Sequence, residues 1–202
     1  MGRAKARLAR RVKTPRWRAG RFSIRFAVAL VFLPLVAAAE PNSSSAAASP
    51  AGQGAAPIVG AAAVGFELKT LDGDAVGLDK YKGRPLVMSF LASWCGPCRE
   101  EMPVLNALAS RADRNGYAVL GIAIQDRRAP VMEFVRETGV VFPIALDLNS
   151  KVQRAYRVFG PPATFFVDAQ GVVRDAVLGP ITPDRAREAL ERAGVRLDRP
   201  LQ

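Results

Sequence analysis

The chain has 202 residues, half of them apolar, which is enough for one ordinary domain with a hydrophobic core plus additional segments. Its formal net charge of +11 comes from residues 1–39, which hold ten Lys or Arg and no Asp or Glu. The other 19 basic residues nearly balance the 18 acidic ones, so the folded part lacks the positive field that attracts phosphates, and we expect no nucleic-acid partner. The absence of histidine excludes Ser-His and Cys-His catalysis and argues against zinc or copper, so we expect no metal site and no cofactor.

The N-terminal segment, residues 1–39, has the composition of an export signal. After a basic stretch that ends at Arg25, the run FAVALVFLPLVAAA, residues 26–39, contains no charge. Its helix would span about 21 Å, less than the roughly 30 Å of a bilayer core, and Pro34 would kink a permanent membrane helix. Two interpretations stay open: a signal peptide cleaved near Ala39, or an uncleaved N-terminal membrane anchor. Both export the domain that follows, because the basic flank stays in the cytoplasm.

Residues 40–59 consist of little besides Ala, Ser, Pro and Gly, a composition with almost nothing to bury. We predict that they form a disordered linker and that residues 60–202 form the folded domain. The sequence contains no internal repeat that would suggest a solenoid.

The first half of the domain predicts a hairpin, then a strand, a helix and a second strand. Two short alternating stretches around Asp72-Gly73 indicate the hairpin. Continuous apolar runs at residues 85–91 and 117–124 suit strands that are buried on both faces. Between them, residues from Cys98 onward have helical spacing that stops at Asn115-Gly116.

The second half continues the alternation of helices and strands. Its predicted elements are a helix opened by Pro130 and closed by Gly139, a helix over 150–158 capped by Asn149, a hairpin that turns at 169–171, and a last helix that begins at Thr182-Pro183 and ends near Gly194. This order predicts an α/β domain in which helices cover a central sheet.

Cys95 and Cys98, the two cysteines of the chain, stand three residues apart in SWCGPC. A bridge over so short a loop removes little entropy from the unfolded chain, which indicates a bond that is made to break and re-form. The pair falls where a predicted strand turns into a helix, so both side chains share one face of the helix start. Free N–H groups and the helix dipole there favour a thiolate at Cys95, the form that attacks disulfides. Cys98 can then resolve the mixed disulfide.

Three other uses of the cysteines agree less well with the sequence. Half of a zinc knuckle would need a second cysteine pair or a histidine, and the chain has neither. A purely structural bridge over so small a loop would stabilise little. A peroxidase cysteine would have Thr or Ser three residues earlier, where this chain has Ala92.

The motif and its surroundings resemble the exported TlpA/ResA branch of the thioredoxin superfamily. The matching runs are FELKTLDGDAVGLDKYKGRPLVMSFLASWCGPCREEMPVL and FGPPATFFVDAQGVV, which frame essentially the whole domain. The resemblance implies a thioredoxin-like fold, with a central mixed β-sheet flanked by helices and an N-terminal β-hairpin extension. It also implies specific roles, with Cys95 as nucleophile, Cys98 as resolving thiol and Pro162 as a cis-proline that orients substrate. The predicted substrate-binding residues are Trp94, Gly96, Pro97, Pro161 and Pro162.

Two positions depart from the thioredoxin pattern. Ser89 stands where thioredoxin has a buried aspartate, and a serine cannot take a proton from Cys98 at neutral pH. Glu101 matches a glutamate that ResA-like proteins keep near the dithiol, so we predict it as the third catalytic residue; the alternative is a solvated glutamate that suits the helix dipole. Pro161 precedes Pro162 at a position where the family pairs with substrate backbone, and it has no N–H to donate.

These features predict an exported thiol-disulfide oxidoreductase that acts mainly as a disulfide reductase. The Gly-Pro dipeptide of thioredoxin, whose potential is roughly −270 mV against about −120 mV for DsbA, favours the reducing direction. The resemblance implies a membrane-embedded thiol electron donor and oxidised client proteins, such as apocytochrome c or proteins of copper-site assembly in cytochrome oxidase. We expect a monomer in the periplasm, either secreted or tethered to the inner membrane. The alternatives are a disulfide oxidase or isomerase, and a non-enzymatic Cu(I) or protein chaperone.

Overall fold

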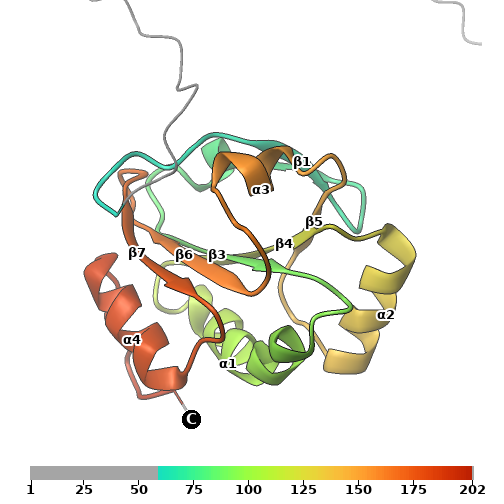
Figure 1. Ribbon diagram of the computed structural model, residues 1–202. Helices are drawn as coiled ribbons and strands as arrows, with labels where there is room; N and C mark the ends of the chain where they lie inside the picture. Colours follow the sequence, from blue (N-terminus) through green and yellow to red (C-terminus); the bar gives the residue numbers. More distant parts are fainter. Residues whose placement is uncertain (1–58, 202) are drawn as a thin grey trace, which may run out of the picture. The chain divides into compact units, whose positions relative to one another are not determined.

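The computed structural model describes residues 59–201 (Figure 1). The predicted signal or anchor segment, residues 1–39, and nearly all of the predicted linker lie outside the described residues. The described elements, in chain order, are β1 (Glu67–Thr70), β2 (Ala75–Gly77), a 3-10 helix (Leu78–Tyr81), β3 (Leu86–Leu91), α1 (Gly96–Ala112), β4 (Ala118–Ile124), α2 (Arg128–Thr138), β5 (Ile144–Asp147), α3 (Lys151–Ala155), β6 (Ala163–Val167), β7 (Val173–Leu178) and α4 (Pro183–Arg192). Within this range, no helix combines the length and the apolar composition that a membrane span needs.

All the described strands belong to one mixed sheet, in the order β2-β1-β5-β4-β3-β6-β7. The central strands β3 and β4 are parallel and buried along their whole length, as their continuous apolar runs predict. On the side of β3 away from β4, strand β6 pairs antiparallel with β3, and β7 pairs antiparallel with β6 as the edge strand. The mixed α/β architecture predicted from the sequence is therefore confirmed.

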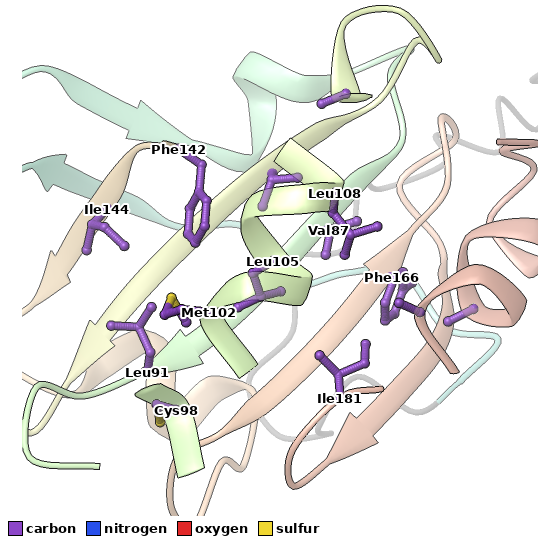
Figure 2. Packing of buried hydrophobic residues seen from close by; sticks show 14 of the residues in the cluster. Val87, Leu91, Cys98, Met102, Leu105, Leu108, Phe142, Ile144, Phe166 and Ile181 are labelled. Atoms are coloured by element: carbon purple, nitrogen blue, oxygen red, sulfur yellow. The ribbon is translucent and has the colours of Figure 1, made fainter. Parts of the chain in front are cut away.

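Helices cover both faces of this sheet (Figure 1). Helices α1, α2 and α4 pack on one face, and α3 packs on the other. Figure 2 shows the first interface, where Leu105 and Leu108 of α1 lie against Val87 and Phe166 of the sheet. Full burial of each such side chain contributes roughly 1.5–3 kcal/mol, so this interface fixes α1 firmly over β3 and β6.

The predicted N-terminal hairpin is an integral part of the sheet. Its turn is closed by a hydrogen bond from the Thr70 N–H to the Asp74 carbonyl oxygen (2.9 Å), with Gly73 at a positive φ of 94°. Strand β1 then pairs antiparallel with β5. The residues before the hairpin reach the opposite edge, where Ala62 bridges Val172. The hairpin thus forms one edge of the sheet, and the segment before it pairs with the chain at the other edge.

The structure differs from the sequence-based expectations at several element ends. Helix α1 ends at Ala112, and residues 113–116 form a turn with Gly116 at a φ of 73°. Helix α3 stops at Ala155, short of the predicted residue 158, because the chain turns at Tyr156. Its first N–H groups bond mainly to Asp147, at 2.7 and 2.9 Å, while Asn149 accepts one bond at 3.1 Å. Strand β5 is an element that the sequence did not predict.

Candidate active site

The two cysteines lie where β3 passes into α1. Cys95 is the N-cap of α1 in an extended conformation, and its sulfur accepts a hydrogen bond from the Cys98 N–H at 3.1 Å. Pro97 lies in the first turn, where a missing N–H costs nothing because that group has no helical partner. Both cysteines are buried in the cluster under α1, and Figure 2 shows Cys98 beside Leu91 at the end of β3. The predicted helix-start position of the pair is confirmed.

Cys95 and Cys98 form a disulfide with their Cα atoms 5.3 Å apart. In the reduced state, the N–H that now bonds to the Cys95 sulfur would stabilise a thiolate on that atom, together with the positive end of the α1 dipole. A thiolate at Cys95 has Cys98 within bonding reach, since the two already form a bond here. The arrangement can therefore exchange a disulfide with another thiol pair.

The loop between β3 and α1 is fastened to the loop that follows β4. The Ser93 N–H donates to Asp126 Oδ2 at 2.6 Å, and the Trp94 Nε1–H donates to the Gln125 carbonyl oxygen at 3.1 Å. Trp94 nevertheless stays 58% exposed. It therefore offers an apolar face to solvent directly beside Cys95.

Arg99 adds a second attachment on the same side. Its guanidinium donates to the Ser93 carbonyl oxygen at 3.1 Å, pairs with Glu137 of α2 at 2.6 Å, and lies over the Phe134 ring at 5.0 Å. Asp126, Gln125 and Arg99 are site residues that were not predicted from the sequence. Gln125 and Asp126 directly follow the buried strand β4. Because β3 and β4 are parallel, their carboxyl ends lie at the same end of the sheet, so the position after β4 could have revealed these two residues.

Glu101 is buried, with 2% of its surface exposed, whereas its neighbour Glu100 is exposed. The alternative of a solvated helix-start glutamate is thereby excluded. Glu101 Oε2 accepts a hydrogen bond from the Ile181 N–H at 2.9 Å, while Oε1 has no partner among the described residues. Burial raises the pKa of this carboxyl from 4.5 to about 7, and the Ile181 N–H opposes that shift. The group can take or give a proton near neutral pH.

Pro162 lies at the same end of the sheet as the cysteines. It immediately precedes β6, whose first residue, Ala163, pairs with Phe90 near the end of β3. The Pro161–Pro162 peptide bond is cis, as the sequence resemblance predicted. Pro162 is buried and Pro161 is half-buried, and the preceding Phe159 is 96% exposed. The substrate-binding roles of both prolines remain predictions.

Comparison with known proteins agrees with this geometry. Residues 59–176 match the model of the AhpC/TSA family. The thiol-disulfide oxidoreductase ResA of Geobacillus thermodenitrificans is 32% identical over 133 residues, which cover 66% of this chain and 76% of the relative.

Two solved structures extend the comparison to the fold. A thiol:disulfide interchange protein of the thioredoxin family from Chlorobium tepidum TLS is 25% identical with a TM-score of 0.59, covering 70% of this chain and 99% of that one. A secreted Mycobacterium tuberculosis disulfide oxidoreductase, homologous to E. coli DsbE, is 25% identical with a TM-score of 0.55, covering 64% and 94%. The predicted thioredoxin-like fold is thus confirmed. On its sequence, its fold and the dithiol at the start of α1, the chain belongs to the AhpC/TSA family as a ResA-like thiol-disulfide oxidoreductase of the thioredoxin superfamily.

Proposed function

We propose that the protein is an exported reductase of protein disulfides. The observation that carries this proposal is the N-cap position of Cys95, whose sulfur accepts the Cys98 N–H one turn before the buried Glu101. That arrangement activates one cysteine, keeps the second ready to resolve, and provides a carboxyl of suitable pKa beside them. The Gly-Pro dipeptide supports the reducing direction.

The reaction begins with the reduced protein. The Cys95 thiolate attacks one sulfur of a client disulfide, so the client S–S bond breaks, a mixed disulfide forms, and one client thiolate leaves and takes up a proton. Cys98 then gives up its proton and attacks the Cys95 sulfur. The Cys95–Cys98 bond of the present structure forms, and the second client thiolate departs. The client gains two electrons from the dithiol. One of its two protons is balanced by the proton that Cys98 gives up, and the other comes from solvent, which received it when Cys95 ionised.

Glu101 is the proposed acceptor for the proton that Cys98 gives up. It is the buried acid on the same helix, and three residues after Cys98 it lies on a neighbouring part of the same face. Its raised pKa keeps a large fraction unprotonated at neutral pH yet able to bind a proton. The exposed Glu100 points away from this face and serves as its natural comparison.

Clients would approach over the apolar surface beside the dithiol. The exposed Trp94 and Phe159 flank the two chain segments that carry Cys95 and Pro162, and both present large apolar side chains to solvent. Pro161 lacks the N–H that would pair with an extended client, so we propose that these side chains carry more of the recognition. Apocytochrome c and copper-site assembly proteins are the proposed clients.

We propose a periplasmic location and a membrane-embedded thiol donor that re-reduces the dithiol. The basic and apolar segments of residues 1–39 support export, as does similarity to a disulfide oxidoreductase described as secreted. An alkaline phosphatase fused after Leu78 should be active in a bacterial host. An inactive fusion would refute export, and N-terminal sequencing of the native protein distinguishes cleavage near Ala39 from an anchor.

Trapping tests the roles of the cysteines and identifies the clients. Cys98→Ser should accumulate mixed disulfides through Cys95, because the resolving thiol is gone, and Cys95→Ser should accumulate none. The adducts are separated on non-reducing gels and identified by mass spectrometry. Preferential trapping by Cys95→Ser would reverse the assignment of nucleophile and resolving thiol.

Equilibration with glutathione tests the direction of the reaction. A reductase should have a potential near the thioredoxin value of about −270 mV. A potential near the DsbA value of about −120 mV would instead favour the oxidase or isomerase alternative.

A further inference from the structure

Three oxygen atoms in the core have no hydrogen-bond partner among the described residues: Ser89 Oγ, Thr164 Oγ1 and Glu101 Oε1. Ser89 and Thr164 are 0% exposed, and Glu101 is 2% exposed. Buried polar atoms are almost always hydrogen bonded, because an unpaired one has lost its interaction with water. Three such atoms in one region therefore call for a common explanation.

Ser89 and Thr164 stand directly opposite each other in the sheet. They are register partners in the antiparallel pairing of β3 with β6. Side chains alternate along a strand, so Ser89 shares the face of Val87 and Leu91, and Thr164 shares the face of Phe166. Figure 2 shows these three apolar residues on the side of the sheet that α1 covers. The two hydroxyls thus lie together beneath α1.

Glu101 reaches the same region from α1. Its Oε2 accepts the N–H of Ile181, a residue that follows β7. Strand β7 is the neighbour of β6, and Val177 on it is the register partner of Thr164. Ile181 belongs to the same buried cluster as Cys98, and Figure 2 shows it beside that interface. The carboxyl of Glu101 is therefore held over the end of β6–β7 that carries Thr164.

We propose that the hydroxyls of Ser89 and Thr164 and the free oxygen of Glu101 are joined through an enclosed water into one polar cluster, which positions Glu101 for proton exchange. A water held by the two hydroxyls can donate to the carboxylate and can equally accept from the carboxylic acid. The cluster thus satisfies Glu101 in both protonation states, which a backbone N–H alone cannot do. Only the kinetic consequence of this inference rests on the proposed reductase function.

The pKa of Glu101 depends on the titratable and charged groups around it as well as on its hydrogen-bond donors. On α1 the titratable neighbours are Cys95 and Cys98, which carry no proton in the disulfide form. The charged groups on the same side are Asp175 of β7 and Arg185 and Arg192 of α4. Both arginines donate to the Asp175 carboxylate, at 2.5–2.8 Å.

Donors to the carboxylate thus come from the Ile181 N–H on one oxygen and from the proposed water, held by the two hydroxyls, on the other. Hydrogen bonds to the charged form lower the pKa of a carboxyl, so removing the hydroxyls should raise the pKa of Glu101 further. At neutral pH the group would then be mostly protonated and unable to accept a proton from Cys98.

The test is the carboxyl titration of Glu101 by ¹³C NMR in the oxidised full-length protein. Ser89→Ala combined with Thr164→Val should raise the pKa of Glu101 by about one unit or more, a tenfold change in its proton dissociation constant. Thr164→Ser, which keeps a hydroxyl, should leave the pKa near the wild-type value in an otherwise unchanged protein. Thr70→Val serves as the control, because this buried threonine lies on β1 away from the site.

A pKa of Glu101 that stays the same in the double variant would overturn the proposal, and so would an equal rise in Thr70→Val. The kinetic arm follows the reductase rate against pH, where the double variant should need a more alkaline pH for its half-maximal rate. If the wild-type protein shows no reductase activity, the proposed function fails while the NMR result still decides the cluster. Loss of folding would be seen in the same spectra, and the single variants then supply the titration.

Discussion

Glu100 and Glu101 show how one position along a helix decides the chemistry of a side chain. The two residues are chemically identical and adjacent, but successive residues point about 100° apart around an α-helix. Glu101, three residues after Cys98, is directed into the core, whereas Glu100 is directed into solvent. Burial raises the pKa of Glu101 to about 7. Only Glu101 therefore combines the location and the protonation behaviour of a proton acceptor.

Replacement of Glu101 by Gln should slow disulfide reduction by about tenfold to a hundredfold, at the low end of general acid–base effects because the helix already favours the thiolate. The wild-type rate should increase with pH as Glu101 loses its proton around pH 7, and the Gln variant should lose this part of the profile. Stopped-flow reduction of a disulfide substrate from pH 5 to pH 9 measures both effects.

Glu100→Gln is the matched control, since it removes the same charge from the same helix turn without entering the core. Its rate should stay within about twofold of the wild type. An unchanged rate and profile in Glu101→Gln would mean that water accepts the proton of Cys98. A larger effect from Glu100→Gln would show that Glu100, and not Glu101, accepts the proton of Cys98.

Much of the site could be predicted one residue at a time from the motif. Cys95 and Cys98 stand at a position that the chain pattern identifies, because strand, turn and helix boundaries are local properties, whereas the cis-proline Pro162 was predicted from the family resemblance. Ile181, whose N–H donates to Glu101, could not be predicted in this way. It lies 80 residues further along the chain, and only the packing of α1 on the sheet brings it against Glu101.

At the scale of elements, β5 shows why a short strand can escape prediction. It has four residues and follows Pro143, so it carries too little alternation to be distinguished from a loop. Its neighbours make it a strand: β4 pairs with it in parallel on one side and β1 antiparallel on the other. Among residues 59–201, the N-terminal hairpin joins the sheet only through this strand.

The hairpin itself depends on Gly77 at the end of β2. A Cβ at this position would lie 2.5 Å from the Phe66 carbonyl oxygen, a backbone atom that cannot move away alone. Gly77→Ala should therefore lower the free energy of unfolding by about 1–3 kcal/mol, as overpacking does elsewhere. Urea denaturation followed by circular dichroism measures the loss.

Gly65→Ala is the comparison, because a Cβ there meets nothing within 4 Å. Its stability should change by no more than about 0.5 kcal/mol. Equal stability of the two variants would show that the hairpin shifts to accommodate the methyl group.

For the molecule as a whole, Glu101 should make stability depend on pH. Its pKa is 4.5 in the unfolded chain and about 7 in the fold. The folded state therefore holds the proton more tightly, and its stability falls as pH rises from 4.5 to 7, by about 3 kcal/mol for a shift of this size. Asp168 and Asp175, whose pKa values are lowered below 3.8, stay ionised in both states over this window and do not mask the effect.

Urea unfolding of the oxidised protein at pH 4.5 and pH 8 measures this dependence. The wild type should lose about 2–3 kcal/mol between the two values, and Glu101→Gln should lose less than about 1 kcal/mol because it has no proton to release. Equal losses in the two proteins would assign the pH dependence to other groups.

The sequence by itself determined the α/β class, the hairpin, the central buried strands and the redox pair at the start of a helix. Each of these follows from local patterns: apolar periodicity, turn residues and the spacing of Cys95 and Cys98. The tertiary structure alone decided that Glu101 is buried, that β5 joins β1 to β4, and that Ser89 and Thr164 stand opposite each other beneath α1. Those outcomes depend on which distant segments pack together, and burial, hydrogen bonding and pKa are set by those neighbours rather than by the adjacent residues in the chain.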